Sequence, residues 1–514
     1  MDAAGEIGPG GPGIVYLVGA GPGDPLLLTR RGLEVLRAAE VVVYDHLGTP
    51  RLLVEAPPGA TLIAAGKSIG HKTMSQEEIN ATLAEHARAG RRVVRLKGGD
   101  PYVFGRGAEE AEHLHALGIP FEVVPGVTSG LGATAAAGIA VTHREAASAV
   151  AFVTGHDDPN NVGRLDWPAL ARFPGTLVIY MGVTRLRYLC ETLVAGGKPA
   201  DTPAALVEAG TTPRQRTVAG TLDTLPDRAS AEKVGFPALL VVGEVVARRG
   251  PLNWSEARPL FGQRIVVTRP AEPDDDSARA LERLGAEVLL APLVALEPVA
   301  DFAAIDRAID GLATRDWLVF TSAHGVRHFL GRILDRGLDL RRLGGVRIAA
   351  IGPATAEALG RFHLRPDLVP GRFGSEALVA SLVDRVRGGR VLLAQADRGR
   401  TTLSDDLGRV ATVERLTVYR HVDADAIRAA VAARIEAGSV DWITATSPAI
   451  VRRLHALIPP PARGRIGTAI RLASISPLTT AAAKELGWPV AAEAEAATWD
   501  GVVAAIRQAV RVEG

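Results

Sequence analysis

Short apolar runs alternate with amphipathic stretches through the first half of the chain. An apolar run at 14–18 leads into a glycine loop, a helical pattern from about 28 to 39 and a second apolar run at 41–44. Strand, helix and strand in this order predict the opening of an α/β sheet. Later apolar runs at 121–124 and 176–183 also reach glycine or proline, which indicates further strand ends.

An internal repeat organises the second half. The segments beginning at Arg264, Asp316 and Arg347 (RIVVTRP, DWLVFTSAHGVRHFL, RIAAIGPATAEALG) recur at Arg390, Asp441 and Arg471 (RVLLAQA, DWITATSPAIVRRL, RLASISPLTTAAAKELG). The offsets of 126, 125 and 124 residues keep both order and spacing. Such a repeat predicts two similar α/β lobes with a cleft between them. Taken alone, it predicts consecutive lobes near 264–386 and 390–514.

Composition narrows the class of protein. The 514 residues suffice for three or four domains of about 100–200 residues each. A formal net charge of +1 gives no indication of nucleic acid as a partner. The one cysteine, Cys190, excludes an intramolecular disulfide and a CxxC metal site, which suits a reducing cytoplasm. No apolar run is long enough to predict a membrane span.

Polar stretches divide the chain. Residues 1–13 lack the basic and apolar regions of a signal peptide, so we expect a disordered tail. The polar, proline-bearing stretch at 247–263 has no period. We therefore expect a first domain at 14–249, a linker at 250–263 and a second domain at 264–514.

The stretch VVRLKGGDPYVFGRG, Val93 to Gly107, carries the first candidate chemistry. Gly98 and Gly99 follow an apolar run and leave room for a ligand to approach the backbone. Asp100 can accept hydrogen bonds from a hydroxyl or an amine, and Arg106 adds a cation. An ordinary strand-to-loop turn is the alternative, because any turn favours Gly, Asp and Pro.

Two further loops raise other possibilities. Glycines after the first strand, with Asp45 at the end of the second, resemble a dinucleotide-binding pattern. The spacing GxGxG at 19–23 does not match the GxGxxG of that motif, however. Lys67 lies in a polar glycine loop, and Ser75 with Glu78 predicts a capping box at the start of the next helix.

Hydroxyl side chains recur at matching points of the two repeats, where apolar strands end and helices begin. Such positions can bind carboxylates at helix N-termini or can simply cap the helices. The residues concerned are Thr321, Ser322, Thr355, Ser447 and Thr479.

The motifs together carry a family resemblance. VGAGPGDP, YDHLG, VVRLKGGDPYVFGRG, VVPGVTSG, GIAVTHR, YMG, GTTPRQ and PALLVVGEVV occur in order over Ile14 to about Arg249. This half resembles the uroporphyrinogen-III C-methyltransferases, which removes the dinucleotide interpretation. In the second half TRP, VFTSAHGV, AIGPAT, ADRGR and VYR resemble uroporphyrinogen-III synthase, although His324 stands where that family usually has asparagine.

The resemblance implies a fold and a reaction for each half. It implies a two-lobed tetrapyrrole methylase fold, then a two-lobed flavodoxin-like α/β synthase fold whose lobes exchange chain near 293–298 and 416–420. S-adenosylmethionine is the implied methyl donor, with no metal, and a homodimer through the first half is expected. The implied product is precorrin-2, made from hydroxymethylbilane through uroporphyrinogen III and precorrin-1 by methylation at C-2 and C-7, in sirohaem or cobalamin biosynthesis.

Carried over by position, the resemblance assigns roles to single residues. Asp45 becomes the proton acceptor and Lys67 a proton donor in the first half, while Tyr419 becomes the acid candidate in the second. Arg106 and Arg144 are candidates for binding substrate carboxylates. The implied contacts to the methyl donor are Pro22, Gly98, Gly99, Asp100, Val103, Thr128, Ser129, Met181 and Gly210.

Two alternatives stay open from the sequence. The first half could methylate a later corrin precursor, since related methylases share the GGDP turn. The second half could bind and channel a tetrapyrrole without catalysis.

Overall fold

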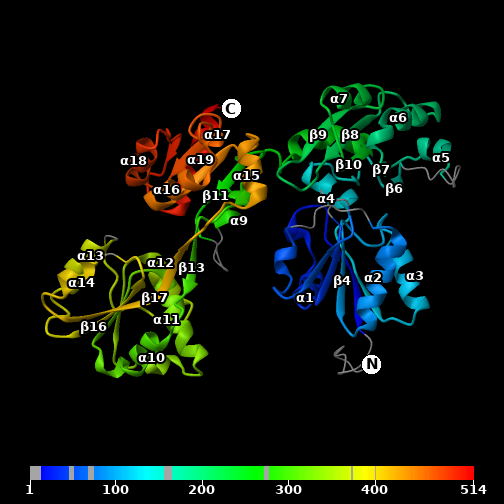
Figure 1. The fold of residues 1–514 in the computed structure, drawn as a ribbon. Helices are drawn as coiled ribbons and strands as arrows, with labels where there is room; N and C mark the ends of the chain where they lie inside the picture. The colour runs from blue at the N-terminus through cyan, green and yellow to red at the C-terminus, as the bar shows by residue number, and fades with distance from the viewer. Residues whose placement is uncertain are drawn as a thin grey trace. The chain divides into compact units, whose positions relative to one another are not determined.

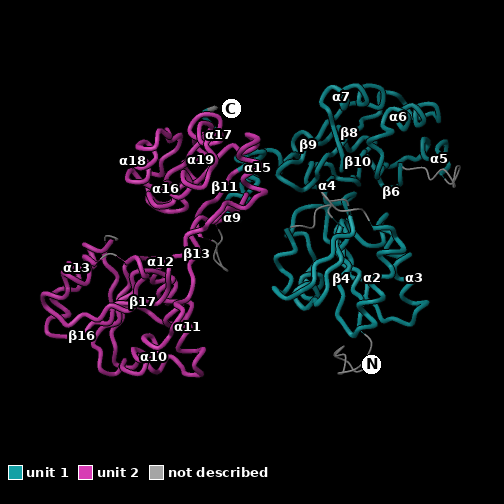
Figure 2. Tube along the Cα trace, viewed as in Figure 1, with its two compact units in different colours: residues 1–264, 279–288, 510–514 teal, residues 265–278, 289–509 magenta. Residues whose placement is uncertain are grey.

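The structure is a computed structural model that describes residues 13–45, 51–66, 74–155, 165–270, 277–371, 374–399 and 401–513. The chain divides into two compact units, shown in Figure 2. Residues 1–264, 279–288 and 510–514 form the first, and residues 265–278 and 289–509 form the second. Except for Gly13, the tail expected at 1–13 lies outside the described residues. No helix within the described ranges is long and apolar enough to cross a membrane.

A parallel five-stranded sheet forms the first lobe of unit 1 (Figure 1). Its order is β3-β2-β4-β1-β5, and every neighbouring pair is parallel. Its strands are β1 (Ile14–Gly19), β2 (Val41–Tyr44), β3 (Thr61–Ala64), β4 (Arg92–Lys97) and β5 (Phe121–Val124). The connecting helices are η1 (Pro25–Leu27), α1 (Arg30–Arg37), η2 (Leu53–Glu55), α2 (Gln76–Arg88) and α3 (Gly107–Ala116). The predicted strand, helix and strand at 14–44 are thus confirmed, with the helix shorter at both ends.

The capping box predicted before α2 is present. The Ser75 hydroxyl accepts from the backbone N–H of Glu78 at 3.2 Å, and the Glu78 carboxylate accepts from the N–H of Ser75 at 2.6 Å. This pair fixes where α2 begins.

The second lobe of unit 1 is a mixed sheet in the order β6-β7-β10-β8-β9. Only β6 and β7 pair in parallel, and the other neighbours are antiparallel. Its strands are β6 (Val150–Thr154), β7 (Thr176–Tyr180), β8 (Pro203–Glu208), β9 (Arg216–Thr221) and β10 (Ala238–Val242). Helix α4 (Ser129–Ala136) precedes this lobe along the chain. The other helices are α5 (Trp167–Ala171), η3 (Val183–Arg185), α6 (Leu186–Ala195), α7 (Leu225–Ala231), η4 (Glu244–Arg248) and α8 (Arg249–Leu252).

The stretch expected to be a linker makes specific contacts within unit 1. The Trp254 indole N–H donates to the carbonyl of Ala135 in α4 at 2.9 Å, and Arg258 stacks on the same indole. Glu256 accepts from Gln215 and Thr217. Residues 254–258 are therefore anchored to the first unit.

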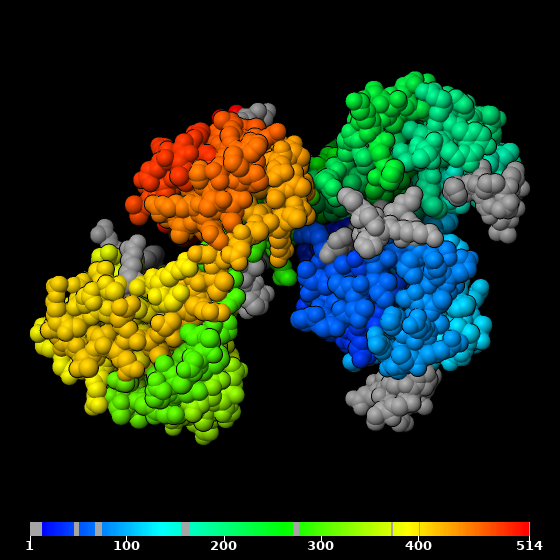
Figure 3. Space-filling model, in the orientation of Figure 1, coloured from blue at the N-terminus to red at the C-terminus, as the bar shows by residue number. Residues whose placement is uncertain are grey.

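The second half of the chain contains two sheets whose strands interleave along the chain. One has the order β12-β11-β18-β19-β20 and the other β13-β17-β16-β14-β15. The strands are β11 (Arg264–Val267), β12 (Glu287–Leu290), β13 (Val294–Pro298), β14 (Trp317–Phe320), β15 (Arg347–Ala350), β16 (Arg390–Ala396), β17 (Thr412–Asp423), β18 (Trp442–Ala445), β19 (Arg471–Ser474) and β20 (Ala492–Glu493). The consecutive lobes predicted from the repeat alone are wrong, and the chain exchange implied by the resemblance is present. In the space-filling view the green-to-yellow middle of this half forms a body of its own (Figure 3).

The helices of the second half are α9 (Ser277–Arg283), α10 (Ala303–Asp310), η5 (Leu312–Thr314), α11 (Ala323–Asp335), η6 (Leu340–Leu343), α12 (Pro353–Gly360), α13 (Ser375–Leu382), α14 (Thr402–Leu407), α15 (Ala429–Glu436), α16 (Pro448–Leu457), α17 (Pro460–Arg463), α18 (Pro477–Glu485) and α19 (Trp499–Glu513) (Figure 1).

Candidate active sites

Three loops meet at the carboxyl edge of the first sheet, where ligands of open α/β sheets bind. Gly21 and Gly99 form an antiparallel bridge, with N–H···O distances of 2.8 and 3.1 Å. Both glycines have positive φ, 78° at Gly21 and 69° at Gly99. The GGDP turn is therefore bonded by its backbone to the loop after β1.

The loop after β5 packs against the same two segments so closely that side chains are excluded. A Cβ on Gly126 would lie 2.2 Å from the carbonyl oxygen of Gly99 and 2.6 Å from the Cα of Gly19. A Cβ on Gly19 would meet Gly126 in turn, at 2.5 Å. Glycine is thus required at the crossing of β1, β4 and β5.

Asp100 joins two of these loops. Its carboxylate accepts from the backbone N–H of Tyr102 at 2.8 Å and from the N–H of Gly126 at 2.9 Å. The sequence predicted a ligand-binding carboxylate here, and the structure also gives it a role in holding the loops together.

Helix α4 connects this edge to the second lobe. The side chain of Thr128, the residue before α4, lies 2.7 Å from the Tyr180 hydroxyl at the end of β7, and the N–H of Gly130 donates to that hydroxyl at 2.8 Å. Both side chains are buried. Met181 follows Tyr180 with a φ of 55° and is 51% exposed, so strained backbone holds this side chain outside the core.

The loop after β8 reaches the same helix. A Cβ on Gly210 would lie 2.2 Å from the Cβ of Ala133 in α4. The backbone N–H of Asp24 donates to the Thr211 hydroxyl at 3.0 Å, and Pro22 lies against Gly132 of α4. Contacts from β1, β4, β7 and β8 therefore converge on the start of α4.

The resemblance assigns its methyl-donor contacts to residues in or beside these converging loops. Gly99 lies near Thr128 and Ser129: a Cβ at Gly99 would be 3.7 Å from the Thr128 Cα and 3.8 Å from the Ser129 nitrogen. Val103 packs with the apolar cluster that includes Ala133 and Tyr180. The glycine-lined backbone fits a ligand that needs close approach to main-chain groups.

The candidate carboxylate-binding arginines are exposed. Arg106 has a φ of 58° and forms a two-point ion pair with Glu109, with an Nη2–Oε2 distance of 2.6 Å. Hydrogen bonding to Glu109 raises the pKa of the Arg106 guanidinium. Arg144 lies at the surface. Both cations are accessible, and Arg106 would share its charge with Glu109.

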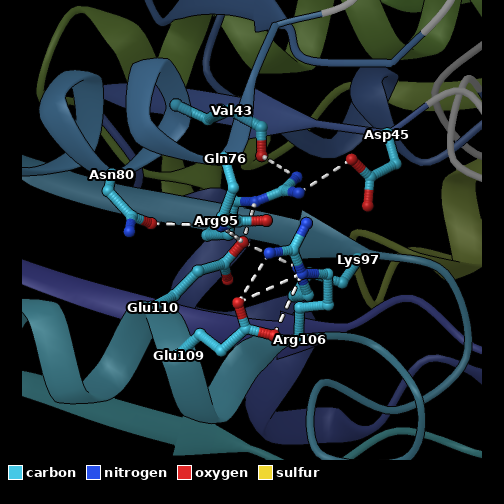
Figure 4. A network of polar contacts seen from close by, with 9 residues as sticks. All are labelled: Val43, Asp45, Gln76, Asn80, Arg95, Lys97, Arg106, Glu109 and Glu110. Atoms are coloured by element: carbon cyan, nitrogen blue, oxygen red, sulfur yellow. Dashed lines mark hydrogen bonds and ion pairs between the residues drawn. The ribbon is translucent and has the colours of Figure 1, made fainter. Parts of the chain in front are cut away.

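Asp45 follows β2 directly and pairs with a residue that the sequence analysis missed. The Arg95 guanidinium of β4 donates from Nη2 to Asp45 Oδ1 at 2.8 Å, and the Asp45 side chain is 29% exposed. Arg95 belongs to a buried charge network with Lys97 and Glu110 (Figure 4). Two charged residues inside the apolar run VVRLK were the signal in the sequence. Lys67 lies outside the described residues.

Tyr419 of β17 is the centre of the candidate site in unit 2. Its hydroxyl lies 3.0 Å from the Ser322 hydroxyl, which also accepts from the N–H of Gly325 at the start of α11. The ring stacks on His328, with an interplanar angle of 18° and centroids 5.5 Å apart, and it contacts His324 and His421. Three imidazoles therefore surround one buried phenol, an arrangement that the sequence analysis missed.

His328 and His421 have different surroundings. Burial, followed by the nearby His324 and Arg327, lowers the pKa of His328. The His421 ring lies 2.8 Å from Asp397. Burial would raise the pKa of Asp397, but hydrogen bonds from His421 and from the Arg398 N–H lower it overall.

The remaining hydroxyl candidates divide by exposure. Ser447 caps α16 and is half-buried, and Thr321 lies 3.4 Å from the Ala394 carbonyl oxygen. Thr355 and Thr479 are buried in the first turns of α12 and α18, at 3% and 0% exposure. Their burial leaves no side-chain surface for a substrate carboxylate. In the part of the chain that the structure describes, no group of three His, Cys, Asp or Glu side chains could hold a metal ion.

Comparisons with known proteins match the two halves separately and together. A model of the tetrapyrrole (corrin/porphyrin) methylases matches residues 14–226, and a model of uroporphyrinogen-III synthase HemD matches residues 275–504. A porphyrin biosynthesis protein HemD from Ruminiclostridium josui is 39% identical over 396 residues, which cover 77% of this chain and 78% of that protein.

Two further relatives extend the comparison. A uroporphyrinogen-III C-methyltransferase from Bacillus subtilis (strain 168) is 42% identical over 70% of this chain and 74% of its own length. An S-adenosyl-L-methionine-dependent uroporphyrinogen III methyltransferase from Methanosarcina barkeri is 52% identical over 46% of this chain and 93% of its own length. The chain thus belongs to the tetrapyrrole methylases through its first half and to the HemD uroporphyrinogen-III synthases through its second half, as a fusion of the two enzyme families.

Proposed function

We propose that unit 1 transfers two methyl groups from S-adenosylmethionine to C-2 and C-7 of uroporphyrinogen III, giving precorrin-2 through precorrin-1. The observation that carries this proposal is the convergence of the β1, β4, β7 and β8 loops on the start of α4. The relative from Methanosarcina barkeri is named an S-adenosyl-L-methionine-dependent uroporphyrinogen III methyltransferase and is 52% identical to the matched part of the chain.

The glycine-lined loops fit the methyl donor, which when bound supplies an electrophilic methyl group to an electron-rich pyrrole carbon. The backbone at Gly98, Gly99 and Gly210 would hold it, and the Met181 side chain would lie beside it. Alignment of the two reactants is the main task of such a site. Arg106 and Arg144 would hold substrate carboxylates as charge-assisted partners.

Asp45 would accept the proton that the macrocycle loses after a pyrrole carbon has been methylated. Its carboxylate is partly exposed at the carboxyl edge of the sheet, and Arg95 holds one of its oxygens. Because an ionised carboxylate with a fixed orientation can act as a general base, this geometry suits the step. Lys67 is proposed as the proton donor from family position alone.

For unit 2 we propose that the substrate of the first unit is made here, by closure of hydroxymethylbilane with inversion of the last ring and loss of water. The Tyr419 hydroxyl, held by Ser322, would assist departure of the substrate hydroxyl. Thr321, Ser322 and Ser447 would meet carboxylates at the starts of α11 and α16. We also propose domains at 14–249 and 264–514 and a cytoplasmic location. We propose a homodimer formed through the first half as well, and light scattering of the full chain would test this by its molar mass.

The test is a mass-spectrometric assay of the full chain given hydroxymethylbilane and S-adenosylmethionine, with a parallel sample that lacks the methyl donor. We expect a dimethylated type III product in the first sample and uroporphyrinogen III in the second. If only the type I macrocycle forms while supplied uroporphyrinogen III is still methylated, the synthase proposal is wrong. If supplied uroporphyrinogen III gains no methyl group, the methylase proposal is wrong.

A further inference from the structure

A buried charge cluster lies under α2 and α3 on one face of the first sheet (Figure 4). Three donors converge on a single oxygen, Glu110 Oε1: Lys97 Nζ at 2.8 Å, Arg95 Nε at 3.1 Å and Gln76 Nε2 at 3.2 Å. The side chains of Glu110, Arg95 and Lys97 are 0%, 3% and 4% exposed. Among the described residues, none donates a hydrogen bond to Glu110 Oε2.

Such a cluster is poorly explained by stability. Removing charges from water is costly, and apolar residues of similar volume often stabilise a core as well as a buried ion pair does. The same sheet is otherwise held by apolar residues, including Val15, Leu17, Val41 and Val43. The role of the cluster is therefore better inferred from its position in the sheet than from its contribution to folding.

Arg95 connects the cluster to Asp45. Its Nε donates to Glu110, and its Nη2 donates to Asp45 Oδ1 at 2.8 Å. Nη1 lies 3.5 Å from the Val43 carbonyl oxygen. Because a guanidinium is planar and rigid, fixing it at Glu110 and Val43 fixes the direction from which it meets Asp45.

The charges of the cluster balance. Asp45 and Glu110 carry two negative charges against the two positive charges of Arg95 and Lys97. Burial, followed by the neighbouring Arg95, lowers the pKa of Lys97, while Glu110 opposes that effect. Further charged groups near the cluster among the described residues are Glu77 in the first turn of α2, Arg106 just before α3 and Glu109 in the first turn of α3.

We propose that Glu110 is a positioning residue for methyl transfer, acting on Asp45 through Arg95. It anchors the guanidinium and offsets the positive charge of Arg95 and Lys97, so that Asp45 keeps both its orientation and its ability to accept a proton. The inference rests on the proposed function, in which Asp45 is the proton acceptor.

The test is the pH dependence of methyl transfer to uroporphyrinogen III by the full chain. Glu110→Gln keeps the volume and the acceptor oxygen but leaves one extra positive charge near Asp45. The acidic limb of kcat should therefore move to lower pH by about one unit, since nearby positive charge favours the ionised carboxylate. We expect kcat on the plateau to fall by up to about tenfold, because a base that is about one unit weaker accepts the proton more slowly.

Lys97→Met should move the acidic limb of kcat in the opposite direction. It leaves one extra negative charge, so the acidic limb should move to higher pH. Glu112→Gln, an exposed glutamate of the same helix, is the matched control and should change neither limb nor rate. Calorimetric binding of S-adenosylmethionine should be unchanged in all three variants, which separates a positioning role from loss of the cofactor site.

Opposite shifts in the two variants support the inference, and unmoved limbs in folded protein overturn it. If Glu110→Gln does not fold, the sign of the shift in Lys97→Met decides by itself. Asp45→Asn is measured in parallel: if it methylates at the wild-type rate, the proposed role of Asp45 fails, whereas a dead Asp45→Asn beside unshifted Glu110→Gln and Lys97→Met overturns only the role of Glu110.

Discussion

Asp45 and Tyr419 show how much a single side chain depends on its partner. The carboxylate is held by Arg95 at 2.8 Å, and the phenol lies 3.0 Å from the Ser322 hydroxyl. Family position identified Asp45 and Tyr419, and the repeat pattern identified Ser322. Arg95 could not be assigned because a charge in an apolar strand shows no partner until the fold brings Glu110 and Asp45 beside it.

Removal of the phenol oxygen of Tyr419 tests the role of its hydroxyl apart from the packing of its ring. Tyr419→Phe keeps the ring among the histidines but loses the hydroxyl at Ser322. If this phenol assists loss of the substrate hydroxyl, the rate of uroporphyrinogen III formation should fall about a hundredfold. Isomer analysis of the product over time measures this rate. A full rate in Tyr419→Phe would contradict the acid role, and methyl transfer to supplied uroporphyrinogen III is the internal control.

His328 should make the stability of unit 2 sensitive to acid. Because burial lowers its pKa below the ordinary 6.5, the unfolded chain binds a proton more readily than the folded chain. Stability should therefore decrease as pH falls below about 6.5. His328→Phe, which keeps a ring against Tyr419, should flatten this decrease in thermal unfolding measured from pH 7.5 to 5. Exposed His115→Phe is the control, and equal slopes in wild type and His328→Phe would refute the prediction.

Among the elements, the strand ends were more predictable than their crossings. The apolar runs at 14–18 and 41–44 gave β1 and β2, and the Ser75 cap gave the start of α2. These features depend on local sequence. The crossing of Gly19, Gly99 and Gly126 joins segments far apart in the chain, so no local pattern could reveal that their backbones touch.

That crossing predicts unequal effects for two similar substitutions. Gly126→Ala would place a Cβ 2.2 Å from the Gly99 carbonyl oxygen, and backbone atoms cannot move aside cheaply. We expect a loss of about 1–3 kcal/mol in unfolding free energy and a fall in methyl transfer, without change in the synthase reaction. Gly59→Ala has no atom within 4 Å of its new Cβ and should change stability by less than about 0.5 kcal/mol. Denaturant unfolding followed by methyl-transfer assays compares the two, and equal stabilities would show that the crossing tolerates a side chain.

Across the whole second half, the repeat shows which position a strand takes within a sheet, but it does not show which of the two sheets the strand joins. The first copy supplies β11, β14 and β15, and the second supplies β16, β18 and β19. In the structure β11 pairs with β18, and β16 pairs with β14, so the two copies exchange their first strands. Sequence similarity between copies cannot distinguish this exchange from two consecutive lobes, because β12-β11-β18-β19 and β17-β16-β14-β15 place matching strands in the same order.

The exchange predicts which pieces of unit 2 fold alone. A fragment of residues 292–424 keeps β13, β14, β15, β16 and β17, with β13 antiparallel to β17, and it contains both apolar clusters of that lobe. A fragment of residues 264–387, cut between the repeats, keeps β14 but loses β16 beside it, and it keeps β11 but loses β18. We expect cooperative thermal unfolding for the first fragment and no folded transition for the second, measured by circular dichroism at equal concentration. Cooperative folding of 264–387 would mean that the copies can form consecutive lobes after all. The exchange would then be one of two arrangements open to this sequence.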